Sequence, residues 1–515
     1  MSKERNKGLS LLGLATAFVL VASACSNGKA GGSDTGTAGT GGAKQEAPLK
    51  VSIMTTYYTP EPPGPDNVIV KEFEKRTNTD LDITWVSSNN YRDKLSVTLA
   101  SGDIPDLVLL DDPFNAQVRT MVAQGAFWDI TDVRKDYPNL MKFPDATWNN
   151  QKQRDGKNYG VPRVRPVEGG SGFIIREDWL KKLNLPVPQT TEDLYTALKA
   201  FKEKNPDGLK PTEVVPFAGA TASDHLNNFI HLQNVFTGTH WHWKAINNEL
   251  VRVDLLPEVR EFIVYMKRLY DEKLIPSDFA VLKGSQVSDM VKGGKAGVYE
   301  NIVENSWEPT EILRKTNPDA TFLPLVSLNG FASKDNGSFG MFAIPKKVSE
   351  EKMKKLIALL DYGASEEGSD LANYGFEGVH HTVENGIKVS TEQAKKDIVA
   401  QQALGQIFLK YDKYLRAWRA GIPNDLYERN KKIIDMREKI SVPDPSTGLY
   451  SETNLKKGGE LDKKIFDLKV KVIMGVKSLE DWDQFVKELK ANPDLIKITE
   501  ELNEAYKARN SKAKG

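Results

Sequence analysis

"LKVSIMTT", residues 49–56, opens the part of the chain that folds and decides its structural class. Val51 and Ile53 alternate with polar residues, which is the period-two pattern of a β-strand. Four further segments continue an alternation of helix and strand: "DNVIVKEFEKRTN" (66–78, capped at Asp66), "LDITWV" (81–86), "NYRDKLSVTLASGD" (90–103) and "DLVLL" (106–110). Strand–helix–strand–helix–strand order predicts an α/β protein with a parallel sheet and right-handed crossovers.

The ends of these strands are the first candidates for a binding site. Ligands of open parallel sheets bind beyond the carboxyl ends of the strands. Tyr57 and Tyr58 end the first strand, and Asp111 and Asp112 end the third. We expect one of the two aspartates to face a cleft and the other to cap the next turn.

The first 47 residues precede the fold. Residues 1–24 have a basic start, an apolar run and a small-residue exit, which is typical of a secretory signal. The exit "VASAC" resembles the lipobox of bacterial lipoproteins, with Ala22 in place of the usual leucine, so Cys25 is the expected lipidation site. A cleaved signal with an incidental cysteine is the alternative. Residues 25–47, rich in Gly, Ser, Thr and Ala, predict a flexible tether.

Composition excludes several classes of partner and site. The 515 residues carry 70 basic and 70 acidic side chains, so no nucleic-acid binding is expected. Cys25 is the single cysteine, so the folded part has no disulfide. The length allows two or more lobes. No cofactor is expected, and the protein is expected to be a monomer.

Eight segments together resemble the extracellular solute-binding proteins of ABC importers. In chain order they are "LASGDIPDLVLLDD" (99–112), "GAFWDITD" (125–132), "DGKNYGVPRVRP" (155–166), "IIREDWLKKLNLPVPQTTEDLYTALKAFKEKNPDG" (174–208), "MVKGGKAGVYENIVENSW" (290–307), "FGMFAIPKK" (339–347), "YGFEGVHH" (374–381) and "KVIMGVKSLEDWDQFVKELK" (471–490). The last two resemble a subgroup of large oligosaccharide- and alginate-binding lipoproteins. The resemblance implies a two-lobed type II periplasmic-binding fold with hinge strands and an interlobe ligand cleft.

The same resemblance implies a function and a division of the chain. It implies a non-enzymatic receptor, lipid-anchored on the extracellular face of the bacterial cytoplasmic membrane, that captures an oligosaccharide and delivers it to the permease subunits of an ABC importer. The expected lobes are residues 48–165 with 338–380, and residues 166–337 with 381–515. Residues 257–275, "PEVREFIVYMKRLYDEKLI", carry one apolar helical face and predict a helix of the second lobe.

Three further residues are predicted to meet a sugar. Trp307 follows a predicted strand that ends at Tyr299 and Glu300, where sugar binders of this fold carry an aromatic residue in the cleft. Arg163 lies where a strand enters the hinge and can bind two hydroxyls or a uronate carboxylate. Glu377 lies between two glycines of "YGFEGVHH", near the ligand in similar proteins. Core packing for Trp307 and a hinge salt bridge for Arg163 are the alternatives.

The stretch "THWHWK", residues 239–244, could serve as a sugar platform or as part of a metal site, besides simple packing. If it is extended, alternate residues share a face, so Trp241 and Trp243 form a sugar platform and His240 and His242 lie opposite. A metal-ion receptor would need a third ligand from His225 or His231. Those two are six residues apart, a poor helical spacing for shared ligation. We therefore expect no metal site here.

A calcium loop and a hydrolase active site would both depend on carboxylates. Some proteins of the family that this chain resembles have an acidic calcium loop in the region of "NPDGLKPTEVVPF" (205–217). In this chain the only carboxylates of that region are Asp207 and Glu213. Calcium takes six to eight oxygen ligands, so none is expected. A lipid-anchored glycoside hydrolase needs two carboxylates across a scissile bond. Asp111 and Asp112, adjacent on a strand, would diverge and make a poor pair.

Overall fold

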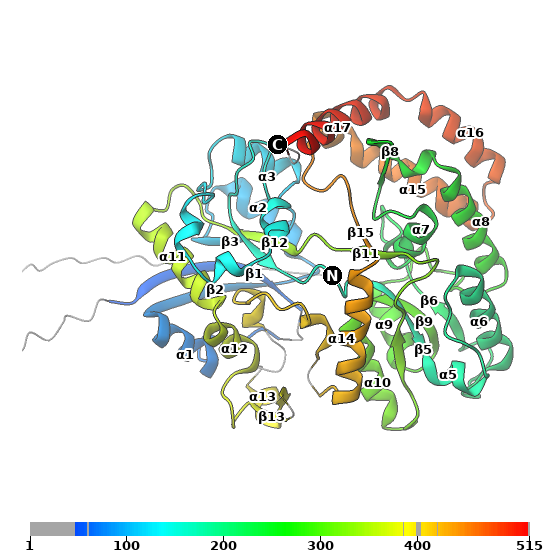
Figure 1. Ribbon diagram of the computed structural model, residues 1–515, viewed down its shortest axis with the longest axis horizontal. Helices are drawn as coiled ribbons and strands as arrows, with labels where there is room; N and C mark the ends of the chain where they lie inside the picture. Colours follow the sequence, from blue (N-terminus) through cyan, green and yellow to red (C-terminus); the bar gives the residue numbers. More distant parts are fainter. Residues whose placement is uncertain (1–46, 59–60, 385, 398–402, 420, 513–515) are drawn as a thin grey trace, which may run out of the picture. The chain divides into compact units, whose positions relative to one another are not determined.

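Two β-sheets, each covered by helices, organise the computed structural model (Figure 1). The structure describes residues 47–58, 61–384, 386–397, 403–419 and 421–512. The predicted signal, the tether and Cys25 lie outside the described residues, apart from Ala47 at the tether's end. The α/β class predicted from the strand and helix patterns is confirmed.

The first sheet contains five strands in the order β2-β1-β3-β12-β4. Their bounds are β1 Leu49–Tyr57, β2 Thr79–Ser87, β3 Leu107–Leu110, β4 Val161–Val164 and β12 Ser338–Ala343. Strand β1 pairs in parallel with β2 and β3, as the alternating pattern predicted, and β12 runs antiparallel between β3 and β4. The chain therefore leaves this sheet after β4 and returns to it with β12.

Helices lie between the strands of this sheet in the sequence and also follow its last strand. They are α1 Val68–Thr77, α2 Tyr91–Ser101, α3 Ala116–Ala123, α4 Asp145–Asn149, α11 Glu350–Gly363, α12 Glu366–Tyr374 and α13 Glu392–Lys396, with 3-10 turns η1 Val133–Asp136, η2 Leu140–Lys142 and η6 Leu404–Gln406. The 3-10 turn η7 Leu415–Ala417 contacts η5 and α14 instead. Helix α1 is capped by Asn67, whose side chain accepts from Ile69 N at 2.9 Å, and not by Asp66 as expected. A small hairpin, β13 His381–Glu384 with β14 Ile387–Ser390, follows α12.

The second sheet contains four strands in the order β10-β5-β9-β6. They are β5 Gly172–Arg176, β6 Val215–Ala218, β9 Ala296–Asn301 and β10 Phe322–Pro324. Around them lie α5 Glu177–Lys182, α6 Thr191–Lys204, η3 Asn227–Phe229, α7 Ile230–Thr237, the hairpin β7 Trp243–Ile246 and β8 Glu249–Arg252, η4 Val253–Leu255, α8 Pro257–Asp271, α9 Gly284–Lys292, η5 Val303–Ser306 and α10 Trp307–Arg314. Helix α8 buries its predicted apolar face, from Val259 to Leu269.

Two neighbouring segments connect the sheets. The backbone N–H of Arg165 donates to Gly337 O at 2.9 Å, and that of Asp335 donates to Val167 O at 2.9 Å. Beside them, strand β11 (Ala332–Lys334) pairs in parallel with β15 (Ser441–Pro443). The segment that leaves the first sheet after β4 is thus hydrogen-bonded to the segment that returns to it before β12.

The C-terminal helices add to the second core. They are α14 Asn424–Glu438, the π-helical turn η8 Asn454–Gly458, α15 Gly459–Ile473, α16 Leu479–Lys490 and α17 Pro493–Lys512. Helix α15 lies against α8, and α17 against β8, so the orange and red helices of Figure 1 border the green ones. In contrast, residues Ala394, Leu404, Ile407 and Phe408 are buried in the core of the first sheet.

Among the described residues, none of the helices combines the length and the apolar character that a bilayer span requires. The longest of those helices, α17, carries charged side chains throughout.

Candidate ligand-binding site

A pocket of about 130 Å³ lies among residues that extend from both sheets. Arg165 follows β4 of the first sheet, whereas Ile302 and Glu304 follow β9 of the second. The remaining lining residues come from α12 and from the chain after it: Asn373, Gly405, Gln406, Leu409, Leu415, Arg416 and Trp418. None of the residues predicted to meet a ligand lines this pocket, although Gln406, which does, is hydrogen-bonded to Arg163.

Two guanidinium groups converge on one amide oxygen at this pocket. Arg163 Nη2 donates to Gln406 Oε1, and Arg165 Nη2 donates to the same atom at 2.9 Å. Arg165 Nη1 donates to Val164 O at 2.7 Å. Strand β4 positions both arginines: Arg163 lies within the strand, and Arg165 follows its last residue, Val164. Arg163 lies within β4, one residue before the strand ends, and its predicted ligand contact stays a prediction.

Arg163 is buried, at 5% exposure, and incompletely hydrogen-bonded. Its guanidinium carbon lies 5.0 Å from the Phe339 ring centre and 5.9 Å from that of Tyr58. Its Nε and Nη1 have no hydrogen-bond partner among the described residues. Burial lowers the pKa of Arg163, with Tyr58, Tyr91 and Asp111 opposing that effect. Burial and repulsion from Arg163 and Arg416 lower the pKa of Arg165 well below its ordinary value.

The position of Gln406 depends on a glycine. A Cβ at position 405 would collide with the side-chain oxygen of Asn373. Asn373 is buried on α12 and donates to Ser369 O at 2.8 Å and Phe408 O at 3.2 Å. Since only glycine allows this close approach, Gly405 fixes where Gln406 meets the arginines.

The residues at the ends of β1 and β3 do not line the pocket, and their contact with a ligand stays a prediction. Tyr58 is exposed beside Arg163. Asp111 forms an ion pair with Arg92, 3.0 Å from Oδ2 to Nε, and its field also reaches Arg163. Asp112 accepts from Phe114 N at 3.0 Å and so caps the following turn, as one of the two aspartates was expected to do. Tyr57, the last residue of β1, is half-buried.

Sequence reasoning missed the segment "KYDKYLRAWR", residues 410–419, which contributes Arg416 and Trp418 to the pocket. Trp418 is half-buried, stands at 76° to the Tyr374 ring with 5.0 Å between centres, and donates to Lys388 O. Arg416 donates to Asp335, and Arg419 to Glu308 at 2.6 Å. The signal that could have found this segment is its density of basic and aromatic side chains.

Trp307 starts helix α10, and its ring is covered. It is 6% exposed and packs with Ile422 and Leu426, and with the half-buried Trp418 and Tyr427. Trp418 connects this cluster to the pocket. Contact between Trp307 and a sugar stays a prediction.

The stretch "THWHWK" is not a continuous extended segment. Only Trp243 and Lys244 belong to β7, whereas Trp241 has a left-handed backbone with φ of 76°. Trp243 is buried at 5% exposure and Trp241 is exposed at 38%. The shared tryptophan face required an extended chain, and the left-handed conformation of Trp241 interrupts that extension before β7 begins. Contact of either tryptophan with a sugar stays a prediction.

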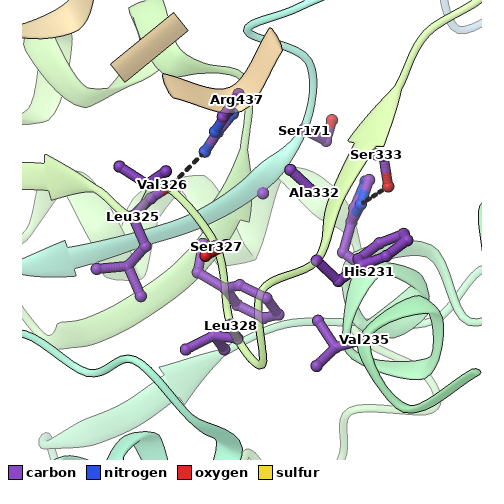
Figure 2. Close-up of a pocket in the computed structure, with 13 residues that line it drawn as sticks. Ser171, His231, Val235, Leu325, Val326, Ser327, Leu328, Ala332, Ser333 and Arg437 are labelled. Atoms are coloured by element: carbon purple, nitrogen blue, oxygen red, sulfur yellow. Dashed lines mark hydrogen bonds between the residues drawn. The ribbon is translucent and has the colours of Figure 1, made fainter. Parts of the chain in front are cut away.

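The nearby histidines contact the connecting strand β11. In Figure 2, His231 points to Ser333, with Nδ1 and Oγ 3.1 Å apart. His240 Nδ1 donates to Lys334 O at 3.0 Å. Burial lowers the pKa of His231 to about 3 and that of His242 to about 4. Within the described ranges, no three His, Cys, Asp or Glu side chains gather as a metal ion would require.

Glu377 lies on an exposed turn before the β13–β14 hairpin, bridged through its backbone to His381. It is not among the residues that line the pocket beside Trp418. Its predicted ligand contact stays a prediction.

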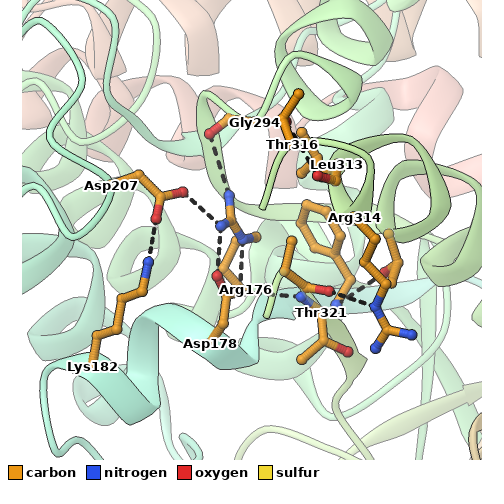
Figure 3. Close-up of polar contacts among 12 residues, drawn as sticks. Arg176, Asp178, Lys182, Asp207, Gly294, Leu313, Arg314, Thr316 and Thr321 are labelled. Atoms are coloured by element: carbon orange, nitrogen blue, oxygen red, sulfur yellow. Dashed lines mark hydrogen bonds and ion pairs between the residues drawn. The ribbon is translucent and has the colours of Figure 1, made fainter. Parts of the chain in front are cut away.

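Both carboxylates of the 205–217 loop are ion-paired with basic side chains. Asp207 accepts from Arg176 Nη2 at 2.7 Å and from Lys182 Nζ at 2.6 Å (Figure 3). Arg176 has no exposed surface and also donates to Asp178. Glu213 pairs with Lys295 at 3.1 Å. A loop whose carboxylates are already paired with three cations does not fit a calcium ion.

We therefore expect the thermal midpoint to be unchanged by a chelator of calcium. A protein whose native state binds a metal is destabilised when the metal is removed. The measurement is a melting curve of the purified protein with and without excess EGTA. A midpoint that falls with EGTA and recovers with calcium would contradict the expectation.

Two α/β units with a pocket lined by residues that follow strands of both sheets are the architecture of the periplasmic-binding fold. Residues 59–370 match the family model described as "Bacterial extracellular solute-binding protein", and the chain belongs to this family. It is 31% identical over 477 residues, 91% of this chain and 93% of the relative, to the "Polygalacturonan/rhamnogalacturonan-binding protein YtcQ" of Bacillus subtilis (strain 168). It is 29% identical to "Lipoprotein LipO" of the same organism, over 89% of this chain and 92% of the relative.

Solved structures support the fold. The "HMO binding ABC-transporter associated Solute Binding Protein" of Bifidobacterium longum infantis matches with a TM-score of 0.69 and 20% identity, over 90% of this chain and 99% of the other. The "alginate-binding protein AlgQ2 without calcium ion" matches with a TM-score of 0.65 and 22% identity, over 90% and 99%. These likenesses confirm the two-lobed fold that the sequence resemblance implied.

Proposed function

We propose that the protein is the substrate-binding component of an ABC importer for oligosaccharides. The observation that carries the proposal is the pocket at the exit of β4, where guanidinium groups, an amide and the Trp418 ring lie together. A sugar offers a C–H face for an aromatic ring and hydroxyls for charge-assisted hydrogen bonds. Relatives named as polygalacturonan- and fructooligosaccharide-binding proteins support a carbohydrate ligand.

In this proposal the two sheets are the cores of two lobes that close on the ligand by hinge motion, and a permease reads the closed form. The lobes are residues 48–165 with 338–380, and 166–337 with 381–515. Ala394, Leu404, Ile407 and Phe408 are buried in the core of the first sheet, so we move these residues from the second lobe to the first in this proposal. The ligand-contacting set comprises Tyr57, Asp111, Asp112, Arg163, Trp241, Trp243, Trp307 and Glu377, to which we add Gln406 and Trp418.

The protein is proposed to bind its ligand without chemistry. Hydrolysis of a glycosidic bond needs a free pair of carboxylates. Asp111 is engaged with Arg92, and Asp112 with the N–H of Phe114. This arrangement favours a receptor over a hydrolase.

The test is a glycan screen followed by calorimetric titration and product analysis. We expect saturable binding of an oligosaccharide, with no shortened product after long incubation. Turnover of the bound glycan would refute the non-catalytic assignment, and failure of every glycan to bind would refute the carbohydrate assignment.

We propose that a lipid on Cys25 anchors the protein outside the cytoplasmic membrane. The name of the relative LipO supports this assignment. We expect Cys25→Ser to move the protein from the membrane fraction to the soluble fraction, because two or more acyl chains are needed for stable anchoring. Fractionation after a high-salt wash measures it, and a Cys25→Ser protein that stays with the membrane would reveal another anchor.

A further inference from the structure

The segment between β15 and η8, residues 444–450 ("DPSTGLY"), belongs to the second lobe and contacts the first. Helix α17 and the second core hold it on its own side. Arg509 of α17 donates to Thr447 O at 2.9 Å, and Leu449 packs against the core of the second sheet. The segment is thus fixed to one lobe, while its last two residues meet side chains of the other.

Two arginines of the first lobe meet the end of this segment. Arg119, on α3, donates from Nη2 to Leu449 O at 3.1 Å, and its guanidinium carbon lies 5.1 Å from the centre of the Tyr450 ring. Arg154, in the chain between α4 and β4, has its guanidinium carbon 4.6 Å from the same ring centre. The ring of a second-lobe tyrosine therefore contacts two first-lobe cations.

The first of these arginines is held by its own lobe. Arg119 Nε donates to Phe114 O at 2.7 Å, and its guanidinium carbon lies 4.9 Å from the centre of the Phe114 ring. Cation–π attraction is stronger when the cation is partly removed from water, as Arg119 is, whereas Arg154 is exposed. Because Arg119 is positioned without the tyrosine, the contact loses little side-chain freedom when it forms.

We propose that Tyr450, Arg119 and Arg154 form a latch that holds the two lobes together and so sets the balance between their closed and open arrangements. The latch consists of protein groups alone, so it acts before a ligand is bound. A protein whose binding-competent arrangement is only partly populated binds with an affinity reduced by that fraction. The three side chains are therefore positioning residues, which raise the affinity for a ligand through lobe closure. The inference rests on the two-lobe closure of the proposed function and is independent of the ligand's identity.

The experiment measures the distance between the lobes in the ligand-free protein. The full chain carries Cys25→Ser, which removes its single cysteine, and spin labels at Val97→Cys of α2 and Val281→Cys after α8, two exposed positions. Pulsed electron paramagnetic resonance reports the distribution of label distances. We expect Tyr450→Ala to lower the ratio of closed to open forms roughly 5- to 30-fold, which corresponds to cation–π contacts of about 1–2 kcal/mol.

Three further variants separate a latch from general packing. Tyr450→Phe keeps the ring and should leave the distance distribution unchanged. Arg154→Gln removes one of the two cations from an exposed position, so it should shift the distribution in the same direction as Tyr450→Ala, by less. Arg268→Gln is the matched control: the Arg268 guanidinium carbon lies 3.3 Å from the Tyr195 ring centre, but both residues belong to the second lobe, so the distances should not change.

The outcomes decide the latch apart from the proposed function. Unchanged distances in Tyr450→Ala would overturn it. An equal shift in Tyr450→Phe or in Arg268→Gln would also overturn it, since ring contact between the lobes would then not be the cause. If Tyr450→Ala does not fold, Arg154→Gln decides alone. If no glycan binds in the screen while the distances shift as expected, the carbohydrate assignment fails and the latch stands.

Discussion

Replacing Asp254 by alanine should lower the free energy of unfolding by about 3–5 kcal/mol, the usual cost of stranding a buried charge. Asp254 is 1% exposed in η4 and accepts from Arg252 Nε at 2.6 Å and from Lys469 Nζ. Lys469 also donates to Gln233 at 2.6 Å, and Arg252 also donates to Asp462. Without Asp254, Lys469 loses the carboxylate with which it is ion-paired in the core of the second sheet.

The network explains how the C-terminal helices are held. Lys469 and Asp462 lie on α15, whereas Arg252 and Asp254 lie at the end of β8 and in η4, some two hundred residues earlier. Burial alone would raise the pKa of Asp254, but Lys469 and Arg252 outweigh burial and lower it. A carboxylate with a lowered native pKa stabilises the fold above its unfolded pKa of about 3.9 and loses that contribution as the pH falls through the native pKa.

Urea unfolding of the wild type and of Asp254→Ala at neutral pH measures the loss in the free energy of unfolding. Repeated at pH values below about 4, the same measurement should show a smaller difference between the two proteins. The matched control is Asp483→Ala. Asp483 also pairs with an arginine, Arg260, but the two side chains are 42% and 43% exposed. Its loss should cost at most about 1 kcal/mol. Equal stability of wild type and Asp254→Ala would show that the buried network adds nothing.

Individual strands and helices were predictable because the hydrophobic periodicity that indicates them lies within a few neighbouring residues. Val51 and Ile53 alternate on β1, and Ile69 and Phe73 repeat at helical spacing on α1, so both elements were expected where they occur. The antiparallel insertion of β12 between β3 and β4 pairs residues that lie far apart in the chain. Periodicity carries no such information, and only the resemblance to a known family placed that strand.

The sequence indicates candidate residues near strand ends, but it does not indicate residues that reach the pocket through close packing. Arg163 lies in β4 and Asp111 directly follows β3, near the strand ends that the sequence predicts, but Asp111 is ion-paired with Arg92. Gln406 reaches the arginines because Gly405 packs against Asn373, a contact that no pattern in the chain reveals. Trp241 and Trp243 would share a face only in an extended chain, and the positive φ of Trp241 interrupts such a chain.

Trp307→Ala should destabilise the ligand-free protein by about 3 kcal/mol, near the lower end of the cost of removing a buried tryptophan. The reason is the small cluster around it, in which Ile422 and Leu426 cover its ring and Arg314 lies 5.8 Å from the ring centre. Trp241→Ala is the matched control, because that ring is 38% exposed and its loss should cost less than about 1 kcal/mol.

Melting curves and calorimetric titration of both variants separate packing from binding. If Trp307 also contacts the sugar, the folded fraction of Trp307→Ala should bind roughly thirty-fold to a thousand-fold more weakly, as expected for a buried aromatic anchor that contributes about 2–4 kcal/mol. Loss of stability with unchanged affinity would assign Trp307 to the cluster alone. Unchanged stability would contradict the buried packing itself, since a ring at 6% exposure cannot be deleted without leaving a cavity.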